Sequence, residues 1–215
     1  MKPKISTVSI SQSTYPENLK NIAIPPEQIF LWGKLSKKDT DAIAIVGTRT
    51  PTKYGLKIAD EFANQLARKF TIISGLARGI DTVVHKAALK AGGRTIAVLG
   101  SGLDYIYPSE NSALAAKISQ SGAVVSEFPL GTKPLGRHFL VRNRIVSGLS
   151  KAVLIVEGAQ ISGTISTATW AAQQGRDVFA IPGPANSRMS EAPNFLIKNG
   201  AYVAVKPQDI IDILL

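Results

Sequence analysis

The sequence contains no cysteine and only two histidines among its 215 residues. Without thiols there can be no disulfides, thiolate zinc sites or cysteine nucleophiles, and two separated histidines are a poor basis for a metal centre. We therefore expect no metal and no cofactor. No apolar run approaches the roughly 20 residues of a membrane-spanning helix, and residues 1–13 lack the apolar segment of a signal peptide. These absences predict a cytoplasmic protein without membrane contact.

The familiar catalytic motifs are also missing. There is no GxSxG elbow, GxxxxGK[ST] phosphate loop or HExxH zinc motif. The nearest approach to the dinucleotide motif GxGxxG begins at Gly100, lacks the third glycine and follows the third predicted strand. Asp81 and His85 share a helical face and could tune a base, but helix capping and a structural hydrogen bond are the favoured roles. We predict no catalytic residue and therefore no enzyme.

Acidic residues are scarce, with 15 Asp and Glu against 25 Lys and Arg, giving a net charge of +10. Such a balance favours an anionic partner. Between Glu127 and Glu157 there is no acidic side chain, and this stretch contains Lys133, Arg137, Phe139, Arg142, Arg144 and Lys151. Fixed cations around an aromatic ring suit single-stranded nucleic acid. A solvated basic face remains the alternative.

Apolar strands alternate with helical patterns from residue 41 onward. Strands are predicted at 42–47, 70–75, 94–100, 123–128, 152–156, 177–181 and 201–205, and helices at 54–69, 79–91, 111–119, 139–149, 162–174, 193–199 and 207–215. This order predicts an α/β fold with a doubly wound, mostly parallel sheet. Residues 1–40, with a short strand at 29–32, are expected to form an N-terminal extension packed on a main domain, 41–215.

Small residues gather where predicted strands end, which is where ligands of such sheets bind. Loops of this kind can cradle phosphates with backbone N–H groups. Glycines and serines at ordinary turns and N-caps would look the same, so both interpretations stay open. The candidates for anion contact in these loops are Gly47, Thr48, Arg49, Ser74, Gly75, Arg78, Ser162, Gly163 and Thr164.

Many of these residues occur in an order that resembles the DprA family, also called Smf. The matching segments include Ala44 to Arg49, Ser74 to Asp81 with His85, Tyr107-Pro108, Ser126 to Pro129, Phe139 through Arg142-Asn143-Arg144, Ser162-Gly163-Thr164 and Pro182-Gly183. The resemblance covers nearly the whole chain. The sequence departs from the family pattern at Leu140, where proline is common, and at Gly136, where some relatives have lysine.

The resemblance implies an extended Rossmann-like fold and a homodimer that binds single-stranded DNA. It implies a recombination mediator of natural transformation, which protects incoming DNA and loads a RecA-type recombinase. It implies DNA contacts from Arg49, Phe139 and nearby basic residues, which with the Arg142-Asn143-Arg144 motif and the strand-end loops gives the candidate site. Many relatives add a C-terminal winged-helix domain, and we expect none here.

Two alternatives remain from the sequence. A nucleotide phosphoribohydrolase would carry PGGxGTxxE, of which only Pro182-Gly183-Pro184 and the distant Ser162-Gly163-Thr164 are present. A nucleotide-sensing module would use the glycine loops but not the basic segment. Within that segment, Arg142 and Arg144 point about 200° apart on a helix. One of them is therefore expected to miss the DNA and can pair with Glu127 or Glu157.

Overall fold

The computed structural model describes residues 4–160 and 162–215. Within them, nine strands form one sheet in the order β1-β2-β6-β5-β4-β3-β7-β8-β9. The seven strands from β6 to β9 are parallel, whereas β1 and β2 run antiparallel to their neighbours. This confirms the doubly wound, mostly parallel sheet. The strands are β1 Ile5–Ser9, β2 Gln28–Gly33, β3 Ala42–Val46, β4 Thr71–Ser74, β5 Thr95–Val98, β6 Ala123–Ser126, β7 Ala152–Ile155, β8 Asp177–Ala180 and β9 Tyr202–Val203.

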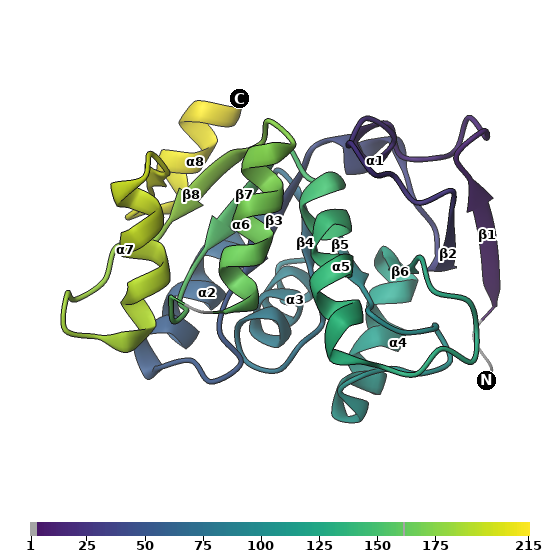
Figure 1. Ribbon diagram of the computed structural model, residues 1–215, viewed down its shortest axis with the longest axis horizontal. Coiled ribbons are helices and arrows are strands. Elements are labelled where there is room, and N and C mark those ends of the chain that lie inside the picture. Colours follow the sequence, from purple (N-terminus) through teal and green to yellow (C-terminus); the bar gives the residue numbers. More distant parts are fainter. Residues whose placement is uncertain (1–3, 161) are drawn as a thin grey trace.

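Helices cover both faces of the sheet (Figure 1). Helices α1, α5 and α6 pack on one face, and α2, α3, α4 and α8 pack on the other. The α-helices are α1 Glu17–Lys20, α2 Lys53–Leu66, α3 Ile80–Lys90, α4 Ser112–Ser121, α5 Gly136–Gly148, α6 Gly163–Gln173, α7 Glu191–Lys198 and α8 Pro207–Leu214, and short 3-10 turns are η1 Lys37–Thr40, η2 Ser109–Asn111 and η3 Arg188–Ser190.

The central strands are apolar throughout because both of their faces are buried. On β3, Ala44 and Val46 join the core under α5 and α6, whereas Ile43 and Ile45 join the core under α2 and α3. Side chains alternate between the faces of a strand, so a strand covered on both sides needs an apolar residue at every position. This explains why the sequence shows continuous apolar runs rather than alternation.

The N-terminal strands extend this sheet on one side. The strand predicted at 29–32 is confirmed as β2, which pairs antiparallel with β6. Strand β1 was not predicted, because its sequence ISTVS is neither continuously apolar nor regularly alternating and its partner β2 is distant in the chain. The connection between them is held by the Tyr15 hydroxyl, which donates to the carbonyl of Pro26 at 2.7 Å. Leu19 of α1 reaches the same core as α5.

Two element boundaries differ from the prediction in ways that matter. The strand expected at 201–205 is reduced to two residues in β9, at the edge of the sheet. Helix α5 begins at Gly136, before the expected start at 139, and its N-cap Leu135 makes no side-chain capping bond. Phe139 therefore lies in the first turn of α5. Its side chain is half-buried beside Gly100, which follows the carboxyl end of β5, and is not part of the core.

The order of the strands creates a crevice beside β3. From β3 the chain moves through β4, β5 and β6 in one direction and then returns to β7 on the other side of β3. The loops after β3 and β7 therefore diverge, and ligands of such sheets bind where they part. Among the described residues, every helix is too short or too polar to cross a membrane.

Candidate nucleic-acid interface

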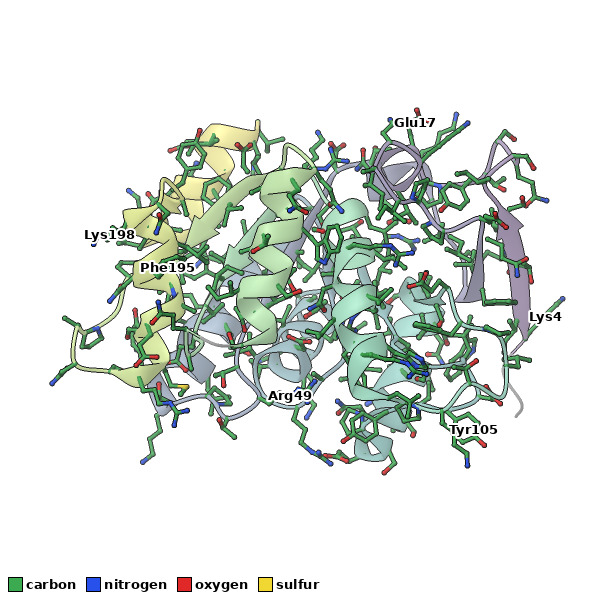
Figure 2. The ribbon with its side chains drawn as sticks, in the orientation of Figure 1. Lys4, Glu17, Arg49, Tyr105, Phe195 and Lys198 are labelled. Carbon is green, nitrogen blue, oxygen red and sulfur yellow. The ribbon has the colours of Figure 1, made fainter. Side chains whose placement is uncertain are left out.

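An open cleft of about 840 Å³ lies at this switch point, between the loops after β3 and β4 and the first turns of α5 and α6. Ten of the predicted site residues line it: Gly47, Thr48, Arg49, Gly75, Phe139, Arg142, Asn143, Ser162, Gly163 and Thr164. Figure 2 shows Arg49 at the lower edge of the view, where the N-terminal ends of α5 and α6 also lie. Tertiary structure thus brings together four segments that are far apart in the sequence.

Arg142 forms part of the cleft wall and is almost fully buried, at 4% exposure. Its Nη1 donates to the carbonyl of Gly75 at 2.7 Å and to the carbonyl of Val98. In the described residues it forms no ion pair with a carboxylate. Burial lowers the pKa of Arg142 to about 10, so it keeps its charge at neutral pH. The Asp81 carboxylate, which also lines the cleft, favours the charged form of Arg142 without forming an ion pair with it. A buried cation whose hydrogen bonds go to carbonyl oxygens attracts an anion in the cleft.

Gly75 permits this placement of Arg142. A Cβ at Gly75 would lie 2.5 Å from Nη2 and 2.7 Å from Cζ of Arg142. Any side chain there would push the guanidinium away. The glycine is therefore required for the close approach of the arginine, and not simply for the turn after β4.

Asp81 and His85 do not form the acid–base pair that their spacing allowed. The Asp81 carboxylate accepts from the N–H groups of Gly75 at 3.1 Å and Ala77 at 3.3 Å, which ties the loop to the start of α3. Nδ1 of His85 lies 2.7 Å from the Thr95 hydroxyl. Burial raises the pKa of Asp81 and lowers the pKa of His85 to about 3. The structural hydrogen bond of His85 is confirmed, whereas Asp81 fastens the loop before α3 and does not cap the helix, whose N-cap Gly79 has no side-chain capping bond.

Arg49 and Phe139 meet at the mouth of the cleft. Cζ of Arg49 lies 5.4 Å from the centre of the Phe139 ring, within cation–π range. Arg49 is exposed and Phe139 is half-buried, so neither is part of the core. Within the described residues, the Arg49 guanidinium makes no hydrogen bond or ion pair. Its donors are therefore available to a ligand, while the backbone of Gly100 supports the ring from below.

The start of α6 forms the opposite wall. Ser162 is the N-cap residue, and its Oγ is buried without a hydrogen-bond partner in the described residues. The amide of Asn143 donates to the carbonyl of Gly163 at 3.2 Å and links α5 to α6. An unpaired hydroxyl beside free N–H groups at a helix start is suited to an anionic oxygen.

Two candidates do not face the cleft, because their side chains are buried and hydrogen-bonded to other parts of the protein. Ser74 is fully buried and its hydroxyl donates to the carbonyl of Ile45 at 2.7 Å. Arg144 is buried on the other side of α5, where Nη1 and Nη2 each lie 2.6 Å from a Glu127 oxygen. The position of Ser74 at a strand end and the charge of Arg144 suggested these residues, but the hydrogen-bonding groups of both are used within the protein. Of the two possible carboxylates, Glu127 takes the arginine, and Glu157 instead accepts from the Thr52 hydroxyl at 2.6 Å.

The remaining candidates lie outside the main cleft. Lys133 and Arg137 are exposed on the segment around Pro134 and Gly136, which themselves line it. Arg78 borders a small adjoining hollow together with Arg49 and Phe139. The sequence analysis missed one contributor, Tyr107, which lines both cavities. Its only signal was its place in the motif Tyr107-Pro108.

The two pieces of the phosphoribohydrolase signature do not come together. Pro182, Gly183 and Pro184 line a separate cavity of about 520 Å³, whereas Ser162-Gly163-Thr164 line the main cleft. In the described residues, no group of three or more acidic or histidine side chains could hold a metal ion.

Comparison with known proteins gives consistent matches. Residues 6–215 match the profile of the family described as DNA recombination-mediator protein A. The chain is 46% identical over 213 residues to Protein Smf of Escherichia coli, covering 98% of this chain and 57% of that protein's length. It resembles the structure of DNA processing protein A from Streptococcus pneumoniae (TM-score 0.93, 40% identity, 97% of this chain and 74% of that one). It also resembles DNA processing protein A from Helicobacter pylori, described for its single-stranded DNA binding mode (TM-score 0.87, 31% identity, 99% and 96%).

Proposed function

Because the chain belongs to the family of DNA recombination-mediator protein A, we propose that it binds single-stranded DNA in the cleft between β3 and α5. There it protects incoming DNA and delivers it to a RecA-type recombinase in the cytoplasm during natural transformation. The chemistry is binding rather than catalysis. The single observation that carries this proposal is the contact of the exposed Arg49 guanidinium with the half-buried Phe139 ring, in the cleft whose lining includes the buried charge of Arg142.

Each part of the cleft suits one part of a nucleotide. Phe139 offers a ring on which a base can stack, which contributes roughly 1–3 kcal/mol per base. Arg49 has free donors for a phosphate, and the α6 start provides a second anionic position through Ser162. In a duplex the faces of the bases are stacked on one another, so a lone ring cannot use them. The arrangement therefore favours unpaired DNA, and the H. pylori relative described as binding single strands supports this.

A titration of single- and double-stranded oligonucleotides of equal length tests the proposal. We expect the single strand to bind more tightly, and Phe139→Leu to weaken single-strand binding by about ten-fold or more while the fold is kept. Phe30 is a suitable control, since it is partly buried near α4 on the opposite face of the sheet and lies outside the cleft. Equal affinity for both forms of DNA, or an unchanged affinity of Phe139→Leu, would contradict the proposal.

We also propose that the protein acts as a homodimer. Exposed apolar side chains gather around the edge strand β9: Phe195, Tyr202, Val203 and Ile213 are each 41–48% exposed. An edge strand with such neighbours is suited to pairing with another chain. Light scattering on the wild type and on Val203→Lys tests this, because a charge at the edge should shift the mass toward the monomer. A wild type that is monomeric at every concentration would remove this part of the proposal.

A further inference from the structure

A second aromatic ring continues the surface of Phe139 away from the cleft. The ring centre of Tyr107 lies 5.6 Å from that of Phe139, with a tilt of 39°. The two rings are in contact, so they form one surface on which neighbouring bases can lie, rather than a slot into which one base inserts. Tyr107 is 40% exposed, so its outer part is open to a ligand.

A second arginine accompanies the second ring. Cζ of Arg78 lies 5.9 Å from the centre of Tyr107, as Arg49 lies 5.4 Å from Phe139. The order Arg49, Phe139, Tyr107, Arg78 therefore places two adjacent rings between two cations, so that each ring has one arginine beside it. A single strand presents a phosphate and a base for each nucleotide, so the repeated pair matches two successive nucleotides.

Unlike Arg49, Arg78 already has an ionic partner. Its Nε and Nη2 lie 2.6 and 3.1 Å from the two carboxylate oxygens of Glu110. Both side chains are more than half exposed, and exposed ion pairs stabilise proteins by only about 0–1 kcal/mol. A phosphate offers the same two-oxygen geometry to a guanidinium. The carboxylate can therefore be exchanged for a phosphate at little cost.

The second ring and the second arginine are held in fixed relative positions. Asn111, which follows Glu110, is buried and its amide donates to the carbonyl of Leu76 at 2.9 Å and the hydroxyl of Thr82 at 2.8 Å. These bonds fasten the η2 turn, next to Tyr107, to the loop that carries Arg78. A platform that is rigid before binding loses little entropy when DNA arrives.

We propose that Tyr107 and Arg78 form a second nucleotide position beside the one at Phe139, and that Glu110 holds Arg78 until a DNA phosphate replaces it. This inference rests on the proposed binding of single strands in the cleft. It places the path of the single-stranded DNA over the protein surface between Arg49 and η2. Glu110 then acts as a competitor that weakens binding and discriminates against ligands with too few phosphates to displace it.

Anisotropy titrations with labelled oligothymidylates of about four and about twelve nucleotides test the second ring. Tyr107→Leu should weaken binding of both strands by about ten-fold, because two neighbouring nucleotides of either strand span the Phe139 and Tyr107 rings. Tyr107→Phe, which keeps the ring, should bind as the wild type does. Tyr105→Leu is the matched control: Tyr105 is in the same loop and is also 40% exposed, but among the described residues it has no contact with another ring and no cation over its own ring.

The competitor role of Glu110 is measured separately. Glu110→Gln should raise the affinity for the longer strand by about two- to five-fold. Glu17→Gln removes the same charge on the opposite side of the molecule from Arg49, as Figure 2 shows, and should have no such effect. Because neither change touches a buried residue, this readout remains if Tyr107→Leu unfolds the protein.

The results also separate this inference from the proposal beneath it. Phe139→Leu should weaken both oligonucleotides. If it does so while Tyr107→Leu behaves like Tyr105→Leu and Glu110→Gln behaves like Glu17→Gln, only the second position is refuted. If Phe139→Leu changes neither affinity, the cleft itself is not the DNA site.

Discussion

Arg49→Ala separates the electrostatic part of DNA binding from the stacking part. Arg49 is exposed and supports no buried contact, so its removal should leave the free energy of unfolding within about 0.5 kcal/mol of the wild type. It should remove one phosphate contact and the cation–π contact with Phe139, while the Phe139 ring itself stays in place. Phe139→Leu, in contrast, removes a stacking surface and no charge. The two variants therefore differ in how their affinities depend on salt.

The size of the effect follows from the cations around the cleft. Arg49, Arg142 and Arg78 border the cleft or its adjoining hollow, and one of the exposed Lys133 and Arg137 can supply a fourth contact. Four neutralised phosphates of a single strand give a slope of log K against log salt of about −2.8. Affinity should then fall about 50-fold between about 50 and 200 mM salt. With three contacts in Arg49→Ala the slope becomes about −2.1 and the fall about 20-fold.

Fluorescence anisotropy at four or five salt concentrations provides both slopes. Phe139→Leu should shift the whole line downward without changing its slope, because stacking releases no counterions. Arg68→Ala is the charge control, since Arg68 is exposed in the turn before β4, at the opposite end of the strands from the cleft. A slope for Arg49→Ala equal to that of the wild type, or equal to that of Arg68→Ala, would refute the placement of a phosphate at Arg49.

Further predictions concern the buried groups. Glu127→Gln leaves the Arg144 charge buried without its partner and should lower the free energy of unfolding by about 3–5 kcal/mol in a urea titration. The folded fraction should keep the DNA affinity of the wild type. A comparable loss of binding free energy in the folded protein would show that Arg144 belongs to the DNA site. Gly75→Ala displaces the Arg142 guanidinium and should weaken DNA binding by about ten-fold or more with secondary structure retained by circular dichroism. The folded pKa of His85 lies near 3, below its usual 6.5, so the unfolded chain binds the extra proton between these values and stability falls as the pH drops through this window. The wild type should lose about 3 kcal/mol more than His85→Gln between about pH 7 and about pH 4, and parallel curves would contradict the buried neutral imidazole.

The fold was predictable because its signal is local. Each central strand needs apolar residues at every position, and each helix between strands repeats its apolar face, so the elements from β3 to β8 could be located by periodicity alone. Strand β1 escaped because its five residues show neither pattern and its stability comes from pairing with β2. Helix α5 was placed too late because Leu135 and Gly136 give no capping signal.

The candidate site was predictable only in part. The sequence indicated which loops would meet, since the carboxyl ends of parallel strands share one edge of the sheet. It could not distinguish Arg142 from Arg144, because both have the same charge and neighbouring positions. Glu127 takes one guanidinium and the carbonyls of Gly75 and Val98 take the other. The sequence also provided no reason to place Tyr107 beside Phe139, since 32 residues separate them.

The sequence by itself determined the α/β architecture, the excess of positive charge and the family to which the chain belongs. Apolar periodicity, composition and motif order can all be read from the order of residues without knowing which segments come into contact. Tertiary structure alone decided which cations are free, which are neutralised and which rings touch. Those properties depend on distances between segments that fold together, and an arginine becomes a binding group or a structural one according to the acceptor that happens to lie within about 3 Å of it.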